Sequence, residues 1–241
     1  MNSDLKVSNY IENNYDLDMK LIREKYYHTF RVAMLTDSLT NSLGLNNDEK
    51  ELAHLIALFH DLGRFREVVR SNEFNNLKFD HGSYSNKILF NDGFINNFPI
   101  NEKDYLLIRK ALYYHNKKNI GNDLNSREEL FAKIIRDTDK IDILHVLASH
   151  QLKFFNEPNP IVLDKFKNNE TIDLRDVKSS SDKIILNIGF YDNLYFKESK
   201  ELLENKGYLD EFINSILVSK ENEEVFTEIK DKVKEKRYVR Y

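Results

Sequence analysis

Residues 57–65 read ALFHDLGRF, and here an apolar run passes directly into a histidine and an aspartate. The apolar residues that lead into it recur at the spacing of one stripe of an amphipathic helix: Leu52, Leu55, Ile56 and Phe59. His60 and Asp61 follow at the end of that stripe, and Gly63 is expected to end the helix. Two strongly polar side chains therefore stand where the pattern otherwise predicts a hydrophobic core.

The composition limits the kind of protein. A chain of 241 residues, 41% hydrophobic and 32% charged, is long enough for a large core and typical of globular proteins. The net charge of −4 offers no overall basic surface, so we expect no nucleic-acid partner. No stretch approaches ~20 consecutive apolar residues, so we expect no contact with a membrane, and the N-terminus does not resemble a secretory signal. The lack of cysteine excludes disulfides, thiol catalysis and cysteine-ligated zinc, and a cytoplasmic location is expected.

The scarcity of turn residues indicates the fold class. Seven glycines and three prolines favour long helices over turn-rich sandwiches and barrels, so we predict one all-α domain, a helical bundle, over the whole chain. A long helix is expected to begin at a cap formed by Asp16 or Asp18 and to run to about Leu43, before Gly44. Further helices are expected over about 81–92, 102–116, 127–155, 193–206, 208–219 and 221–237. Segment 156–182 holds two of the prolines and is expected to form a short irregular or hairpin insertion.

Other histidines and aspartates share the unusual placement on apolar helix faces. They are His28, His81, His115, Asp137, Asp139 and Asp142. A single inward histidine is more often a hydrogen-bonded core residue, and an unpaired buried carboxylate costs several kcal/mol, but a divalent cation would neutralise several carboxylates at once. Together with His60 and Asp61, these residues have no shared structural purpose except metal binding. The remaining histidines lack the pattern and are expected to be structural or exposed: His54, His145 and His150.

The order of these residues resembles a known signature. His28, then the His60–Asp61 pair, then an aspartate in DTDKID is similar to the pattern of the HD superfamily of metal-dependent phosphohydrolases. The flanking segments HTFRVAML and LIALFHDLGRF also resemble the first two motif helices of that family. The likeness covers about 26–147 as the motif core of a single HD-type domain. Residues from about 150 to 241 would then form a helical C-terminal extension.

The resemblance implies a metal site with named ligands. The first divalent ion would be held by His28, His60, Asp61 and Asp139, and Asp61 would bridge to a second ion held by His81 and His115. The choice of Asp139 over Asp137 follows the family, in which the ligand directly precedes a basic residue, here Lys140. The one or two ions would be Mn, Fe, Co, Ni, Zn or Mg. Imidazole with carboxylate suits Mn, Fe, Co, Ni or Zn better than calcium.

The resemblance also implies the chemistry. A water activated by two such cations would hydrolyse a phosphate ester of a nucleotide or another small metabolite, and a small phosphorylated substrate is the expected partner. Asp61 and Arg64 are the candidate catalytic residues. Arg64 stands where the family often has lysine, and it keeps a permanent cation but does not readily lose a proton. Arg31, Arg64 and Lys117 are candidates for phosphate binding by charge and position, with an exposed solvated charge as the alternative for each.

Other classes of function remain open at this point. The helical scaffold could be a ligand-binding or regulatory protein without turnover. A dinuclear-iron oxygenase is a second alternative, because some dinuclear metal proteins of this general shape react with oxygen. A plain helical interaction protein would bind no metal at all.

Overall fold

The computed structural model describes residues 2–71 and 79–238, and nearly all of its regular structure is helical. The predicted all-α fold is therefore confirmed. The chain divides into two compact units, residues 1–142 and 143–241, and each is described by itself. The division falls inside one helix, and a single domain over the whole chain stays a prediction.

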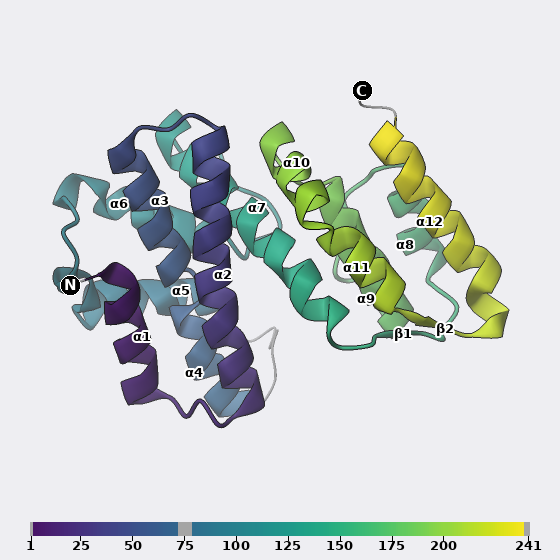
Figure 1. The fold of residues 1–241 in the computed structure, drawn as a ribbon, viewed down its shortest axis with the longest axis horizontal. Coiled ribbons are helices and arrows are strands. Elements are labelled where there is room, and N and C mark those ends of the chain that lie inside the picture. The colour runs from purple at the N-terminus through teal and green to yellow at the C-terminus, as the bar shows by residue number, and fades with distance from the viewer. Residues whose placement is uncertain (1, 72–78, 239–241) are drawn as a thin grey trace. The chain divides into compact units, whose positions relative to one another are not determined.

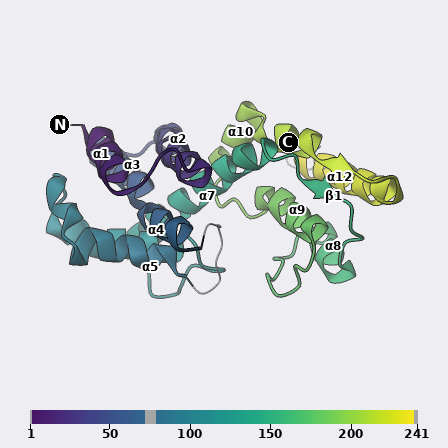
Figure 2. The ribbon, with the colours of Figure 1, turned by 90° about the horizontal axis from the view of Figure 1, so that it is seen from below.

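The first unit consists of helices joined by short turns. Its helices are α1 (Ser3–Asn14), α2 (Lys20–Ser42), α3 (Asn47–Phe59), α4 (Leu62–Ser71), α5 (His81–Asn86), α6 (Tyr105–Tyr114) and α7 (Ser126–Ala148), which continues past the division. A π-helical turn at Lys87–Asn91 extends α5, and 3-10 turns occupy Phe94–Asn97 and Glu102–Asp104. Helix α2 packs against α3, and α4 packs against α5 (Figures 1 and 2). The helices that carry the candidate site are thus in direct contact.

Helices α2 and α3 form over the two segments whose apolar spacing predicts helix. Helix α2 ends before Gly44, whose φ of 69° is accessible to glycine at little cost. The side chain of Asn46 then caps α3 by accepting a hydrogen bond of 3.0 Å from the Glu49 amide. The apolar stripe that precedes His60 is buried: Leu52, Leu55, Ile56 and Phe59. Each of these side chains contributes about 1.5–3 kcal/mol when it is removed from water.

The N-terminal region differs from the sequence prediction. Helix α1 was not expected, because only Val7 and Ile11 mark its buried face. Neither predicted aspartate caps α2: the residue before the helix is Met19, which makes no side-chain cap. The carboxylate of Asp16 instead accepts a hydrogen bond of 2.8 Å from the amide of Asp18. Both aspartates therefore stabilise the turn between α1 and α2 rather than the start of α2.

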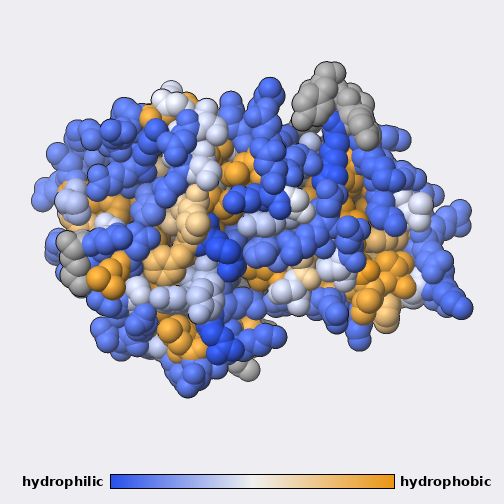
Figure 3. All heavy atoms as spheres, viewed as in Figure 1, coloured by the Kyte–Doolittle hydropathy of each residue, from blue (hydrophilic) through white to orange (hydrophobic). Residues whose placement is uncertain are grey.

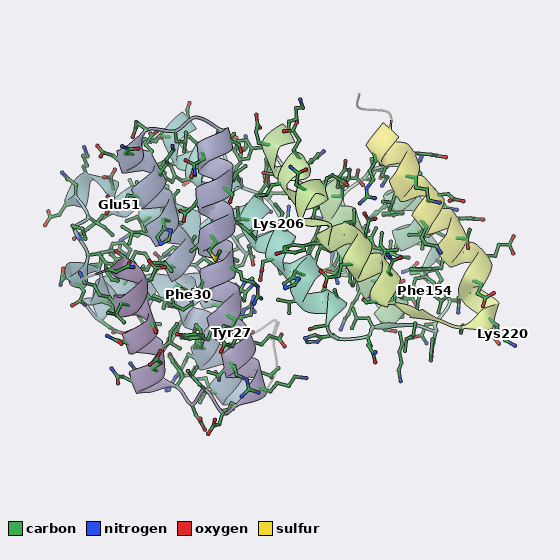
Figure 4. The ribbon with its side chains drawn as sticks, viewed as in Figure 1. Tyr27, Phe30, Glu51, Phe154, Lys206 and Lys220 are labelled. Carbon is green, nitrogen blue, oxygen red and sulfur yellow. The ribbon has the colours of Figure 1, made fainter. Side chains whose placement is uncertain are left out.

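Among its described residues, 143–238, the second unit contains five further helices and two short strands. They are β1 (Lys153–Phe154), α8 (Pro160–Lys167), α9 (Ser180–Ile188), α10 (Lys197–Lys206), α11 (Tyr208–Ser215), β2 (Leu217–Val218) and α12 (Glu223–Tyr238), with 3-10 turns at Gly189–Tyr191 and Lys220–Asn222. The strands pair in parallel, with Lys153 opposite Leu217 and Phe154 opposite Val218. Phe154, labelled in Figure 4, is fully buried, and its ring contacts that of Phe226 on α12. The strand pair thereby ties the start of this unit to its end.

Two expectations for this part of the chain are wrong. Helix α7 ends at Ala148 and not near residue 155. Segment 156–182 is irregular over residues 168–179, as one of the two alternatives expected, but it is not a hairpin: its residues belong to neither strand, and it contains all of α8 and the first turn of α9. The reason is that Asn159 caps α8 and Pro160 occupies the first helical position, where the missing amide hydrogen of proline costs nothing. The prolines therefore mark the start of a helix.

The surface is mostly polar on the face drawn in Figure 3, with apolar side chains scattered between charged ones. The largest exposed hydrophobic side chains include Tyr27 and Met34 on α2, and Tyr27 is labelled in Figure 4. In the described residues, no helix combines the length and the apolar character that crossing a bilayer requires.

His54, one of the histidines outside the metal pattern, joins three helices of the first unit. Its Nδ1 lies 2.9 Å from Asp37 Oδ1 on α2, and its Nε2 lies 3.2 Å from Asp4 Oδ2 on α1. The hydrogen bond with Asp37 raises the pKa of His54, and the smaller lowering by burial does not cancel it. A raised pKa means that the protonated histidine is favoured in the folded state. The stabilisation is therefore complete below the unfolded pKa of ~6.5 and disappears as the pH rises through the higher folded pKa.

We expect the His54→Gln substitution to lower the melting temperature by about 2–4 °C at pH 6, since a partly exposed ion pair contributes up to about 1 kcal/mol. At pH 8.5 the loss should be smaller, because a larger fraction of the wild-type histidine has lost its proton there than at pH 6. Thermal melts followed by circular dichroism at both pH values measure this difference. The same substitution at His150, an exposed histidine of the second unit, is the control. Equal losses for His54→Gln at both pH values would contradict the prediction.

Candidate metal centre

A break between two helices positions His60 and Asp61. Helix α3 ends at Phe59 and α4 begins at Leu62, so the two polar residues occupy the junction. The expectation that Gly63 ends a helix is wrong, because Gly63 is the second residue of α4. His60 and Asp61 therefore lie at a bend between two helices and not at a solvent-exposed helix end, and both side chains are buried.

Gly63 lies where α4 approaches α5 most closely. A Cβ atom at this position would stand 2.2 Å from the carbonyl oxygen of His81 and 2.8 Å from the amide nitrogen of Ser85. The amide of Gly63 donates to Ser85 Oγ, and that hydroxyl donates to the carbonyl of His60, each at 2.9 Å. The missing side chain thus lets α5, which begins at His81, dock against the junction that carries Asp61 (Figure 2).

Four of the predicted ligands converge in a first group. His28 Nε2 lies 3.1 Å from Asp139 Oδ1 and 3.6 Å from Asp61 Oδ2. His60 Nε2 lies 3.4 Å from His28 Nε2, 3.6 Å from Asp61 Oδ2 and 3.8 Å from Asp139 Oδ1. Helices α2 and α7 and the α3–α4 junction supply these residues. Asp139 lies at this group as the resemblance implied, and Asp137, the alternative, is buried two residues before it.

The other two predicted ligands form a second group around the other oxygen of Asp61. His81 Nε2 and His115 Nε2 lie 3.6 and 3.7 Å from Asp61 Oδ1 and 3.1 Å from each other. His81 begins α5, and His115 directly follows α6. One carboxylate therefore offers Oδ2 to the first group and Oδ1 to the second.

The outer ring nitrogens determine which atoms face the two groups. The Nδ1 atoms of His60 and His115 each donate, at 2.6 Å, to the carbonyl oxygen three residues earlier in the chain. Nδ1 of His28 lies 2.6 Å from a carboxylate oxygen of Asp142, which also can only accept. In the neutral imidazoles the hydrogen is then on Nδ1, and Nε2 directs a lone pair into the group.

The electrostatics favour the protonation states that ligands of a metal require. Burial lowers the pKa of His60 to about 4, and burial together with the nearby Arg64 guanidinium holds the pKa of His81 well below its ordinary value. Burial raises the pKa of Asp61, but Lys25, then His60 and Arg64, outweigh it and hold that pKa well below the usual range. At neutral pH these pKa values favour an ionised Asp61 and uncharged His60 and His81. His28 differs: burial and Lys25 lower its pKa, but the hydrogen bonds with Asp139 and Asp142 outweigh them and raise it.

Two cationic side chains approach the two oxygens of Asp61. Lys25 Nζ donates to Oδ2 at 2.9 Å. Arg64 Nη2 lies 3.0 Å from His81 Nε2, and its Nε lies 3.7 Å from Oδ1. Arg64 was a predicted site residue, whereas Lys25 was missed. Its signal was present in the sequence, because Lys25 precedes His28 by three residues and so lies on the same face of α2.

The other two predicted phosphate-binding residues form ion pairs next to the ligands. Lys117 Nζ donates to Asp80 Oδ2 at 2.6 Å. Arg31 donates to Asp142 twice, from Nε at 2.7 Å and from Nη2 at 2.9 Å. Asp142 was recognised as a polar residue in an apolar helix but was given no role, and here it contacts His28 as well.

A buried arginine that sequence reasoning missed anchors the end of α6. Arg136 Nη1 donates to the carbonyl oxygens of Tyr114 and Lys117, both at 2.6 Å, and Nη2 donates to that of Lys118 at 3.1 Å. Carbonyls at the end of a helix have no partners within the helix, so a side chain that collects them fixes the turn. Arg136 thereby holds the segment that contains His115.

The ligand spacing and this geometry agree with one family of proteins. The sequence model of a family described as HD domain matches residues 26–146, half of the chain, and every residue of both groups lies within this range. The chain belongs to the HD-domain family. We found no match among curated proteins and none among solved structures. HD domains typically bind divalent metal ions, and their family consists mostly of metal-dependent hydrolases.

The donor atoms of this HD domain fit a metal ion. His28, His60 and Asp61 in one group, and Asp61, His81 and His115 in the other, are all buried and offer ligand atoms within 4.8 Å of one another. Nε2 of His28 and Nε2 of His60 lie 3.4 Å apart, and when both rings carry their hydrogen on Nδ1 a cation would satisfy the two lone pairs that then face each other. Nitrogen with carboxylate oxygen favours Mn, Fe, Co, Ni or Zn over calcium.

Proposed function

We propose that this HD-domain protein is a metal-dependent phosphohydrolase that cleaves a phosphate ester of a nucleotide or another small metabolite. The observation that carries the proposal is the division of Asp61 between two groups of buried histidines, with Oδ2 toward one and Oδ1 toward the other. A carboxylate in this position is suited to bridging two divalent ions. Two-metal sites of this kind recur in enzymes that hydrolyse phosphate esters.

The proposal assigns a role to each ligand. His28, His60, Asp61 and Asp139 would hold one ion, and Asp61, His81 and His115 would hold the other. When bound, the ions supply Lewis-acid chemistry: they lower the pKa of a water and neutralise charge on the phosphoryl oxygens. The burial of the ligands, 0–6% exposed for His28, His60, Asp61, His81 and His115, keeps competing water away from these positions.

The cations of the chain would orient the substrate. Arg64 has a permanently charged, planar guanidinium that can donate to two phosphoryl oxygens at once, and its side chain retains 12% exposure. Lys25 lies at the opposite oxygen of Asp61. A phosphoryl group at Asp61 would therefore have a positive charge on either side. Lys117, which is 28% exposed beside Asp80, is suited to contact a more distant part of the substrate.

Metal analysis of untagged protein purified without chelator tests the proposal. We expect about two equivalents of a transition metal in the wild type and about one in both His28→Ala and His115→Ala, because each variant loses one ligand of a single group. His145→Ala, at a partly exposed histidine of the second unit, is the matched control and should keep both. Protein loaded with the metal found should then release phosphate from a panel of phosphate esters under argon.

Three results would contradict the proposal. Protein that contains no metal and takes up no added manganese would indicate a helical interaction protein. Bound metal without phosphate release from any ester would favour a ligand-binding or regulatory role. Iron-dependent consumption of oxygen would favour an oxygenase.

A further inference from the structure

His28 is held between two carboxylates from successive turns of one helix. Asp139 and Asp142 lie three residues apart on α7, so they share a face of that helix. Asp139 Oδ1 lies 3.1 Å from Nε2 of His28, and Asp142 Oδ2 lies 2.6 Å from Nδ1. The first carboxylate belongs to the candidate ligands. The second lies behind the ring, away from the candidate ligands, and the proposed function gives it no task.

Asp142 is fully buried, and Arg31 fixes its charge and orientation. Arg31 donates to both carboxylate oxygens, from Nε to Oδ1 at 2.7 Å and from Nη2 to Oδ2 at 2.9 Å. Arg31 lies one turn after His28 on α2, so a single helix presents both partners of Asp142. A bidentate arginine of this kind leaves the carboxylate no second rotamer and keeps it ionised.

The other three histidines of the two groups have weaker hydrogen-bond partners at Nδ1, the ring nitrogen that faces away from the candidate ligands. His60 and His115 donate from Nδ1 to neutral carbonyl oxygens. For His81, the carboxylate of Glu67 is 3.9 Å from Nδ1, which is too long for a hydrogen bond, and the group within reach of Nδ1 is the neutral side-chain amide of Asn116, whose Nδ2 lies 3.3 Å away. An anionic acceptor behind an imidazole makes Nε2 a stronger donor to a metal than a carbonyl does. Among these four histidines, His28 is therefore the one with the strongest donor nitrogen.

We propose that Asp142 and Arg31 are positioning residues for His28 and make its group the tighter of the two metal positions, so that the positions fill in order. The inference rests on the metal site of the proposed function. The number of carboxylates acts in the same direction. The first position combines Asp61 and Asp139, whereas the second shares only Asp61. Each position has one cation close to it, Lys25 at 2.9 Å from Asp61 Oδ2 and Arg64 at 3.0 Å from His81 Nε2, so Asp139 makes the difference.

Calorimetric titration of metal-free protein with cobalt(II) alone, together with the visible absorption of the bound ion, tests the order and its cause. We expect two steps in the wild type. In Asp142→Asn the tighter step should weaken about 10–100-fold, the loss typical when the outer partner of a metal-binding histidine is removed. The weaker step should stay unchanged, and the absorption spectrum of the first ion should shift. Arg31→Lys should weaken the same step, because a lysine cannot hold both oxygens.

The control is Asp104→Asn. Asp104 is a buried carboxylate of the same unit that pairs with Arg127 at 2.6 Å. This variant should keep both steps even if it loses stability, which separates a purely structural role of Asp142 from a positioning one. Two wild-type steps that Asp142→Asn leaves unchanged would overturn this inference and leave the proposed function intact. A wild type that binds no cobalt would overturn both.

Discussion

The Asp61→Ala variant should lose both metal positions and fall at least about 10³-fold in phosphate release, because Lewis-acid stabilisation of several kcal/mol disappears with the metals. No other single ligand should have this effect, since the other ligands of the proposed site belong to one group each. Metal content per chain and phosphate release at saturating metal are the two measurements. The loss should exceed that of His28→Ala or His115→Ala, which each remove one side of the site.

Two further variants make this result interpretable. Asp61→Asn preserves the size of the side chain and should show the same loss of metal, which separates the missing charge from a packing defect. Asp48→Asn changes an exposed aspartate in the first turn of α3 and should retain metal and activity. Far-UV circular dichroism checks that each variant remains helical. Wild-type turnover in folded Asp61→Ala would refute the metal mechanism.

Gly63→Ala should be the most disruptive small substitution in the first unit. The new methyl would stand 2.2 Å from the His81 carbonyl and 2.8 Å from the Ser85 amide, both of which are backbone atoms that cannot rotate away. Relief requires α4 and α5 to separate, so we expect a loss of about 3 kcal/mol and a melting temperature lower by about 6–12 °C. His81 would move with α5, so the metal position of His81 and His115 should weaken as well.

Gly189→Ala provides the matched control. Its φ of −65° suits alanine, and the nearest atom to the added methyl is a Phe166 ring carbon at 3.8 Å, an ordinary contact. This variant should melt within about 2 °C of the wild type or slightly above it. A Gly63→Ala protein as stable as Gly189→Ala would show that α4 and α5 are not packed as described.

Three histidines among the candidate ligands stand out in the sequence because each interrupts an apolar pattern, whereas the full ligand set, with Asp139 in place of Asp137, followed from the resemblance to the HD family. His28, His60 and His115 lie on stripes that are otherwise hydrophobic, and the structure buries all three. Their partners could not be found in this way. Lys25 and Arg31 look like ordinary surface charges of α2, and only the packing of α2 against the junction and α7 brings them to carboxylates.

In the fold, too, features that depend on the local sequence pattern could be predicted, whereas features that depend on contacts between helices could not. The long helix α2 was predicted closely, to within one residue at its C-terminal end, and the apolar stripe of α3 was recognised, although α3 ends at Phe59 and not at Gly63. The function of Gly63 was misjudged because a helix end and a close helix contact favour the same residue, and only the neighbouring backbone of α5 distinguishes them. Helix α8 was missed because a proline usually interrupts a helix. Only the cap formed by Asn159 shows that Pro160 occupies the first position of a helix, where proline is tolerated.

The anchoring of the α6 end by Arg136 has a consequence for how such a protein can diverge. The arginine recognises main-chain oxygens of Tyr114, Lys117 and Lys118, and every amino acid supplies such an oxygen. Substitutions in this turn therefore leave its attachment unchanged, whereas Arg136 itself has no equivalent among the other side chains. Under the proposed function, in which Lys117 contacts the substrate, a lineage can alter the chemistry of this turn while His115 stays in place. Selection for a new substrate and selection for an intact site then act on different positions of the chain.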